Sequence, residues 1–298
     1  MRVFLTGATG FIGSAIVSEL INAGHEVLGL ARSDAGAQAL VSVGAQVHLG
    51  SLEDLDILRD GAAAADAVIH TAFDHDFSNF AVNCEKDRKV IEALGSALAG
   101  STRPLIITSV TGVAAVEPGA VATEDDAPVS VEVHPRASSE EAANYVAKLG
   151  CNVLVLRMPQ VHDTHKHGLW TYLIETAREK GVSAYIGEGL NRWPAAHVLD
   201  TAHLYRLALE KGRAGAVYNA VAEEGLTLRD IAGAIGQRLN IPIVSLPPDG
   251  AQQHFGWLAR AVALDLAASG DKTRRELDWK PNHPGMITDL RNAQIRNV

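Results

Sequence analysis

One phrase recurs through the first half of the sequence, and this repetition restricts the fold more than any other feature. An amphipathic helix ends in a glycine and is followed at once by a short apolar strand, as in "SELINAGHEVLGL", "ALVSVGAQVHLG" and "YVAKLGCNVLVLR". Glycine stops helices because it adopts the left-handed backbone conformation without strain. Strands that are apolar throughout are typical of sheets covered on both faces. Such strands alternating with helices predict a parallel sheet with right-handed crossovers.

The expected fold class is α/β, a Rossmann-type doubly wound parallel sheet with a smaller C-terminal substrate lobe. We expect strands at about residues 2–6, 26–31, 46–49, 67–71, 105–109 and 153–157. After Arg157 the loops lengthen, and helices are expected at 169–180 and 227–239. The predicted dinucleotide-binding domain covers residues 1–160 with a returning segment at about 195–215, and the predicted substrate-binding lobe covers residues 161–194 and 216–298.

The composition excludes several classes of protein. The 298 residues carry a formal net charge of −9, whereas a surface that binds nucleic acid or anionic lipid needs clustered Lys and Arg. No stretch reaches the ~18 consecutive apolar residues of a membrane helix, and the first residues lack a signal-peptide pattern. Cys84 and Cys151 lie far apart, which favours buried thiols over a disulfide. We expect a cytoplasmic monomer or homodimer that binds a small-molecule substrate, with no nucleic-acid or membrane partner.

The first expected strand leads into the glycine-rich stretch "TGATGFIG". Its glycines occur at three-residue spacing and open a helix that ends near Gly24. Glycines between a strand and a helix let the backbone approach a pyrophosphate, which then meets the free N–H groups at the helix N-terminus. The sequence therefore predicts a dinucleotide-binding loop formed by Gly7, Ala8, Thr9, Gly10, Phe11, Ile12 and Gly13.

With this loop, the chain resembles the extended short-chain dehydrogenases/reductases of the epimerase/dehydratase branch. "MRVFLTGATGFIGSAIVSELINAGHEVLGL" is similar to the opening of that family, and "ADAVIHTAF" to its fourth strand. "LRMPQVHD", "RWPAAHVLDTAHLY" and "TRRELDWKP" resemble its Arg-x-Pro-x-x-Tyr-Gly, His-x-x-Asp-x-Ala and Arg-x-x-Leu-Gly-Trp-x-Pro segments, in the same order. The resemblance implies a nicotinamide dinucleotide in the Rossmann domain and a substrate under the C-terminal lobe.

The resemblance also implies cofactor contacts outside the glycine loop, at the ends of the later strands. These are Ser51 and Leu52 near the adenine, Thr71 and Ala72 along the pyrophosphate and ribose, Ser109 after the fifth strand, and Pro159 and Val161 beside the nicotinamide. Each of these residues has an alternative role in loop or core packing. For Ser109 we expect a hydrogen bond to the backbone.

The end of the second strand indicates which nicotinamide cofactor binds. Members that prefer NAD(H) have an aspartate there for the ribose hydroxyls, whereas this chain has Ala31, followed by Arg32 and Ser33. An arginine can bind a 2′-phosphate through charge-assisted hydrogen bonds and stack on the adenine. Asp34 could supply the missing acid one position late, but we assign it to capping the next helix. The sequence predicts NADP(H), with NAD(H) as the alternative.

The family's proton donor is the tyrosine of a Tyr-x-x-x-Lys pair on the helix before the sixth strand, and this chain departs from that pattern. Counting back from "CNVLVLR" places Arg136 at the tyrosine position and Glu140 at the lysine position. They are predicted to bind each other or the substrate. A register one residue earlier, with Pro135 and Ser139, does not restore the pair either.

Tyr145 and Lys148 in "PRASSEEAANYVAKLG" resemble a catalytic couple but lie about two turns too late on the helix. Ala142, Val146 and Leu149 have the spacing of a buried stripe, and Tyr145 borders it. Lys148 in the last turn complements the helix dipole. We interpret both residues as structural.

Two other residues are predicted to be catalytic. Thr111 lies near the family's hydroxyl position after the fifth strand, and His162 stands where the family has the tyrosine of Arg-x-Pro-x-x-Tyr-Gly. Imidazole can give or accept a proton near neutral pH. The histidines of "VHDTHKHGLW" lie on a loop without a preorganising element, so no metal site is predicted. Trp170, Trp193, Phe255 and Trp257 are candidates for an apolar substrate pocket or for the core.

The leading functional hypothesis is an NADP(H)-dependent oxidoreductase that acts on a small carbonyl or alcohol through non-standard catalytic residues. Two alternatives remain open. One is a non-catalytic protein that senses the NADP(H) state, which the complete C-terminal motifs disfavour. The other is a nucleotide-sugar epimerase or dehydratase, which is disfavoured because that chemistry needs the tyrosine base and because few positive charges mark a diphosphate site.

Overall fold

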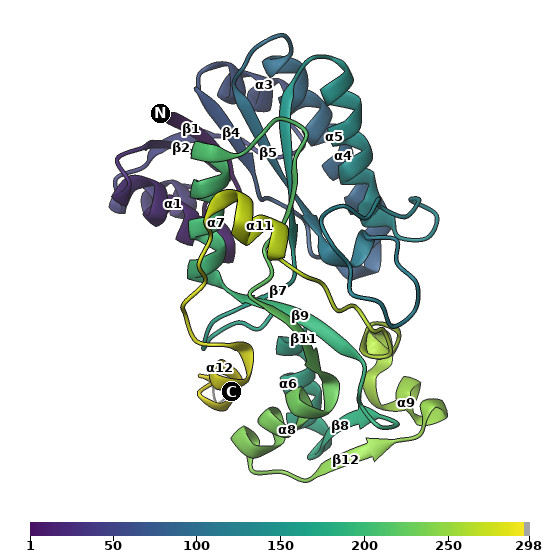
Figure 1. Ribbon diagram of the computed structural model, residues 1–298. Helices are drawn as coiled ribbons and strands as arrows, with labels where there is room; N and C mark the ends of the chain where they lie inside the picture. The colour runs from purple at the N-terminus through teal and green to yellow at the C-terminus, as the bar shows by residue number, and fades with distance from the viewer. Residues whose placement is uncertain (295–298) are drawn as a thin grey trace.

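The main sheet consists of parallel strands in the order β10-β6-β5-β4-β1-β2-β3 (Figure 1). The computed structural model describes residues 1–294 of the chain. The strands of the sheet are β1 (Arg2–Thr6), β2 (Glu26–Ala31), β3 (Gln46–Leu49), β4 (Ala67–His70), β5 (Pro104–Val110), β6 (Asn152–Met158) and β10 (Val217–Asn219). The reversal of strand order between β1 and β4 is that of a doubly wound Rossmann sheet, which confirms the predicted fold class.

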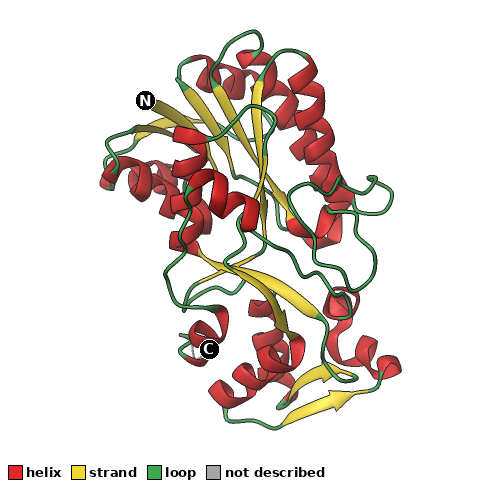
Figure 2. Cartoon of the chain, in the orientation of Figure 1, coloured by secondary structure: helices red, strands yellow, loops and turns green. Residues whose placement is uncertain are grey.

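Helices cover both faces of this sheet (Figure 2). On one face, apolar side chains of α1 (Phe11–Asn22) and α7 (Val198–Lys211) pack in one core with those of β1 and β6. On the other face, α3 (Leu55–Ala63), α4 (Phe80–Leu98) and α5 (Ser138–Lys148) form a second core. With both faces buried, strands such as β1 and β5 have few polar positions, as their sequences predict.

Local signals explain where the helices begin and end. Gly24, Gly44 and Gly150 have φ values of 84° to 85° directly after α1, α2 (Asp34–Ser42) and α5, as the predicted glycine stops require. The predicted cap at Asp34 is wrong. The Ser33 hydroxyl accepts the Gly36 N–H at 3.2 Å and caps α2, because the helix begins one residue earlier than assumed and leaves Asp34 in its first turn.

The predicted stripe on α5 is also partly wrong. Ala142 and Val146 are buried, but Leu149 is the C-cap residue that follows the helix and is 45% exposed. Ala143 is buried in its place against α4. Tyr145 is 51% exposed and lies outside the core, and Lys148 lies in the last turn as expected.

The second lobe has its own apolar core below the sheet. It contains α6 (Trp170–Lys180), β8 (Ser183–Ile186), α8 (Leu228–Leu239), β12 (Ile243–Leu246), α9 (Ala251–Phe255), α10 (Ala259–Val262) and α12 (Met286–Arg291). A small sheet in the order β11-β9-β7 lies between the two lobes (Figure 1). Its strands are β7 (Gln160–His162), β9 (Arg192–His197) and β11 (Glu223–Thr227). Within residues 1–294, no helix is long and apolar enough to cross a membrane.

Chain segments beyond residue 215, where we expected the returning segment to end, also pack in or on the main sheet. β10 pairs with β6 from Val217 to Asn219, and α11 (Asp271–Leu277) packs on α7 and β10. Trp279 then joins the core that the sheet forms with α1 and α7, and its indole N–H donates to the Asp200 carbonyl on α7 at 3.0 Å. Parts of the predicted 216–298 lobe therefore belong to the sheet.

Candidate active site

In the glycine-rich loop between β1 and α1, the backbone at Gly7 and Gly13 leaves no room for a side chain. Gly7 has φ of 73°, and its carbonyl accepts the Gly10 N–H at 2.8 Å. A Cβ built on Gly13 would lie 2.0 Å from that carbonyl oxygen. The N-terminus of α1 has no side-chain cap and no acid in its first turn, so its N–H groups remain available to an anion. These features fit the pyrophosphate of a dinucleotide.

The loop after β4 lies directly against this cradle. A Cβ on Gly7 would lie 2.7 Å from the Ala72 nitrogen. The Thr71 hydroxyl donates to the Thr6 carbonyl at 2.8 Å, and the Ala72 N–H donates to the Thr6 hydroxyl at 3.4 Å. The structure therefore brings Thr71 and Ala72 together with the glycine loop.

At the end of β2, Ala31 is buried and Arg32 is exposed. The Arg32 guanidinium forms no ion pair with any residue between 1 and 294, so it is available to an external anion. Ser33 beside it is exposed but serves as the cap of α2. Within residues 1–294, no carboxylate forms a hydrogen bond or ion pair with Arg32 or Ser33, and the exposed Asp34 lies in the first turn of α2.

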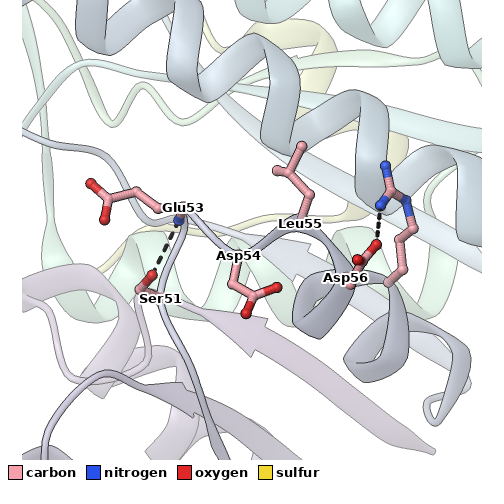
Figure 3. Close-up of a pocket in the computed structure, with 6 residues that line it drawn as sticks. Ser51, Glu53, Asp54, Leu55 and Asp56 are labelled. Atoms are coloured by element: carbon pink, nitrogen blue, oxygen red, sulfur yellow. Dashed lines mark hydrogen bonds and ion pairs between the residues drawn. The ribbon is translucent and has the colours of Figure 1, made fainter.

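Ser51 and Leu52 follow β3 and are half-buried, and Ser51 lines a shallow hollow (Figure 3). The Ser51 hydroxyl accepts the Glu53 N–H at 3.3 Å. Carboxylates dominate the rest of the hollow, and its one arginine is paired with an aspartate at 2.6 Å. Because negative charges repel a phosphate, this hollow is unsuited to the pyrophosphate.

Arg136 is buried in a polar network and does not bind Glu140. Its Nη1 donates to Asp87 Oδ2 at 2.5 Å and to the Ser139 hydroxyl, and its Nη2 donates to the Thr108 carbonyl at 2.9 Å. The guanidinium carbon also lies 4.2 Å from the centre of the Phe73 ring, in the loop after β4. The predicted Arg136–Glu140 contact is therefore wrong, because Asp87 on α4 satisfies the guanidinium instead.

Asp87 connects this network to the end of β4. Its Oδ1 accepts His70 Nε2 at 3.0 Å, and His70 Nδ1 lies 2.6 Å from the Thr6 hydroxyl. Burial raises the pKa of Asp87, but the Arg136 charge and the hydrogen bonds from His70 and Ser139 outweigh it and lower the pKa to about 2. Asp87 is thus a carboxylate at neutral pH.

Glu140 forms a second buried ion pair, with Arg157 on β6. Arg157 donates to the two carboxylate oxygens from Nε and Nη2, both at 2.8 Å, and Nη2 also donates to the Asp126 carbonyl at 3.0 Å. The bidentate pair fixes α5 to the sheet, and the hydrogen bond to Asp126 holds the long loop that precedes α5. The first residue of the Arg-x-Pro motif is thus structural here.

Thr111 and Ser109 lie at the end of β5. Thr111 is the first residue of a short 3-10 turn, Thr111–Val113, and is 7% exposed. Its hydroxyl makes no hydrogen bond within residues 1–294. The Ser109 hydroxyl is fully buried and likewise has no partner in the described chain, so the expected bond to the backbone is wrong. The strand backbone at Ser109 is already paired with β6.

His162 is completely buried between the lobes. Its Nδ1 donates to Asp289 Oδ2 on α12 at 2.7 Å, and its ring lies edge-on to His197. Burial lowers its pKa to about 4 despite the attraction of Asp289, so the imidazole is neutral at pH 7. Pro159 and Val161, which precede it in the sequence, are buried as well. No group of three or more potential ligands in residues 1–294 could hold a metal ion.

Aromatic side chains from both lobes meet beside the loop after β4. Phe77 stacks on Trp257 of the second lobe at 5.1 Å, and Tyr172 on α6 lies edge-on to Trp257 at 5.2 Å. Phe80 and Phe73 extend this interlobe aromatic cluster to Arg136. Trp257 is 56% exposed, whereas the other three pocket candidates are core residues: Trp170, Trp193 and Phe255.

Sequence reasoning missed Asp87, His70 and Phe77. Asp87 occurs in "NCEKDRKV", which has the composition of a solvated helix face, so no local signal marks it. The run "FDHDFSNF" after β4 is a signal that could have been used, because aromatic residues in a loop at the carboxyl edge of a parallel sheet lie where ligands bind.

Comparison with known proteins gives the class of this protein. The model of the NAD dependent epimerase/dehydratase family matches residues 3–221, and the chain belongs to that family. Its Rossmann sheet and glycine cradle are consistent with this assignment and with nucleotide binding.

Similar proteins cover nearly the whole chain. An uncharacterized protein of Schizosaccharomyces pombe is 47% identical over 97% of this chain and 98% of its own length. A 4-hydroxy-2-methyl-3-oxo-4-farnesyl-3,4-dihydroquinoline-1-oxide ketoreductase of Stigmatella aurantiaca is 26% identical over 98% of this chain and 96% of that protein. The structure of a dTDP-glucose 4,6-dehydratase from Streptomyces venezuelae, with NAD bound, covers 98% of this chain and 96% of its own, with a TM-score of 0.77 and 22% identity.

Proposed function

We propose that this protein is an NADP(H)-dependent oxidoreductase that reduces a carbonyl, or oxidises an alcohol, attached to an apolar body. The observation that carries the cofactor assignment is the exposed, unpaired guanidinium of Arg32 directly after the buried Ala31. A cation fits the 2′-phosphate that distinguishes NADP(H), and Ala31, at the position where NAD(H)-preferring members have an aspartate, offers no carboxylate to a free 2′-hydroxyl.

The glycine cradle and the N-terminus of α1 would bind the pyrophosphate, with Thr71 and Ala72 alongside it. Arg32 would bind the 2′-phosphate, and Pro159 and Val161 would form the apolar surface beside the nicotinamide. Once bound, the cofactor supplies or accepts the hydride. The chain's own task is to orient the substrate and to stabilise charge on its oxygen.

Thr111 is our candidate for contact with the substrate oxygen. Thr111 directly follows β5, and its hydroxyl makes no hydrogen bond within the described residues. On the same strand, the Thr108 carbonyl accepts a hydrogen bond from Arg136. A threonine hydroxyl can donate a hydrogen bond to developing negative charge. His162 has its Nδ1 committed to Asp289 and no exposed surface, so we assign it a positioning role between the lobes.

The interlobe aromatic cluster supports a substrate with an apolar body. Trp257 and Tyr172 expose ring surface beside Phe77, and such rings bind flat or hydrocarbon groups. The Stigmatella relative is named as a ketoreductase of a farnesylated dihydroquinoline oxide, which is a carbonyl compound of this chemistry.

The cofactor assignment is tested by titrating NADPH and NADH into wild type and Arg32→Ala. We expect wild type to prefer NADPH by about tenfold or more, since a charge-assisted contact contributes about 1.5–3 kcal/mol. Arg32→Ala should lose this preference and keep its affinity for NADH. The matched control is Arg275→Ala, which removes an exposed arginine on α11. Equal affinities of wild type for the two cofactors would contradict the assignment.

A further inference from the structure

Lys166 comes from the loop between β7 and α6, outside the Rossmann sheet, yet its ammonium group lies over the ring of Phe11, where the glycine loop leads into α1. Its Nζ is 5.5 Å from the centre of the Phe11 ring. Phe11 directly follows Gly10 and is the first residue of α1, whose N–H groups face an incoming phosphate. A cation from the second lobe therefore lies next to the anion-binding end of α1.

The backbone that carries Lys166 is closed into a turn. Asp163 Oδ1 accepts the N–H groups of His165 and Lys166 at 2.6 and 2.8 Å, and the Asp163 N–H donates to the Lys166 carbonyl at 2.8 Å. Next to this turn, the Thr164 carbonyl accepts the Gln294 N–H at 2.7 Å. The turn fixes the base of the side chain and leaves the ammonium group free to move.

Within the part of the chain that the structure describes, no carboxylate pairs with this ammonium group. Lys166 is exposed and forms no ion pair within residues 1–294, and the first turn of α1 contains no acid. Its charge also acts on the loop after β4: burial and then the charge of Arg136 lower the pKa of His75, and Lys166 adds to this lowering. The positive charge of Lys166 thus acts near the loop after β4 as well as at the start of α1.

We propose that Lys166 binds the pyrophosphate of the dinucleotide, so that the second lobe completes the cofactor site. This inference rests on the proposed function. The glycine cradle offers neutral N–H donors, whereas a pyrophosphate carries negative charge, and a lysine on a flexible stem supplies the opposite charge where the cradle is open. The cofactor would then link the two lobes.

The test compares wild type, Lys166→Met and Lys148→Met by calorimetric titration with NADPH, NADH, ADP-ribose and adenosine. Methionine keeps an unbranched apolar side chain of similar length and removes the ammonium group with its charge. Lys148, exposed at the end of α5, is the matched control. We expect Lys166→Met to weaken NADPH, NADH and ADP-ribose alike by about tenfold and to leave adenosine unchanged. Lys166→Arg should restore most of the affinity.

The outcomes separate this inference from the proposed function. Arg32→Ala should weaken NADPH alone, whereas Lys166→Met should weaken both dinucleotides. Wild-type affinity for all ligands in Lys166→Met would overturn the role of Lys166 and leave the NADP(H) assignment intact. A lower melting temperature with unchanged affinity would show that Lys166 only packs on Phe11, and would also overturn it. If wild type binds neither dinucleotide, the proposed function and this inference both fall.

Discussion

Arg136 and Glu140 are buried charged residues near the start of α5, each paired with a different partner. Arg136 is bonded to Asp87, and Glu140 is bonded to Arg157 on β6. Breaking a buried pair by removing one partner costs about 3–5 kcal/mol, because the other charge is left uncompensated. A guanidinium also stays protonated in proteins. Both residues therefore stabilise the fold around the site, and proton transfer falls to other groups.

Thr111 and Tyr145 give a sharp contrast between a hydroxyl at the site and one outside it. Thr111→Val keeps the side-chain shape and removes the hydroxyl, and we expect kcat to fall by about 10²-fold or more. Tyr145→Phe should change activity and stability little, because the ring is half exposed and its hydroxyl makes no hydrogen bond within residues 1–294. Steady-state kinetics, with thermal unfolding measured in parallel, compare the two variants. A folded Tyr145→Phe protein that binds NADPH but has lost activity would overturn this interpretation of α5.

At the level of elements, sequence patterns predicted the helices and strands whose positions depend on neighbouring residues. The phrase of helix, glycine and apolar strand located β2, β3 and β6, and short apolar runs located β1, β4 and β5, because glycine stops and two-sided burial are visible in the sequence. β10 was missed because three residues are too short for a periodic pattern, and its pairing with β6 joins segments far apart in the chain.

The same division applies to the site. The glycine cradle was predictable, since its geometry depends on neighbouring residues. The partners of Arg136 and His162 were not, because Asp87 and Asp289 come from distant helices that only the folded chain brings close. Because the sequence does not show the contact with Asp289, we predicted His162 to be a free imidazole beside the nicotinamide.

His162 on β7 is bonded to Asp289 on α12, and its protonation should lower the stability of the folded protein at acidic pH. The unfolded chain binds a proton on this imidazole near pH 6.5, whereas the folded chain does so only near pH 4. The unfolded state therefore gains protons first as the pH falls, and roughly 3 kcal/mol of stability is lost between these values. His167 and His197, also with lowered pKa values, act in the same direction, while the raised pKa of Glu223 opposes them.

Urea unfolding at several pH values between 7.5 and 4 checks this prediction. His162→Gln keeps an amide donor for Asp289 and cannot be protonated, so its stability should depend less steeply on pH than that of wild type. Equal slopes in the two proteins would show that His162 does not carry the effect.

For the molecule as a whole, the candidate site is divided between two lobes. The Rossmann sheet contributes the glycine cradle, Arg32 and Thr111, while the second lobe contributes Trp257 and, by our inference, Lys166. Neither lobe alone supplies both the cofactor cradle and the interlobe aromatic cluster. Hydride transfer would therefore require the two lobes to be in contact.

The central claim is that the bound nicotinamide exchanges hydride with an apolar carbonyl compound. The most direct test mixes the protein–NADPH complex, in single-turnover conditions, with a panel of aromatic and short aliphatic ketones and aldehydes, and follows the nicotinamide absorbance. We predict that aromatic ketones oxidise one equivalent of NADPH with formation of the alcohol, faster than short aliphatic ones, and that Thr111→Val suppresses this reaction. Tight NADPH binding with no oxidation by any member of the panel would contradict the claim and indicate a non-catalytic NADP(H)-binding protein.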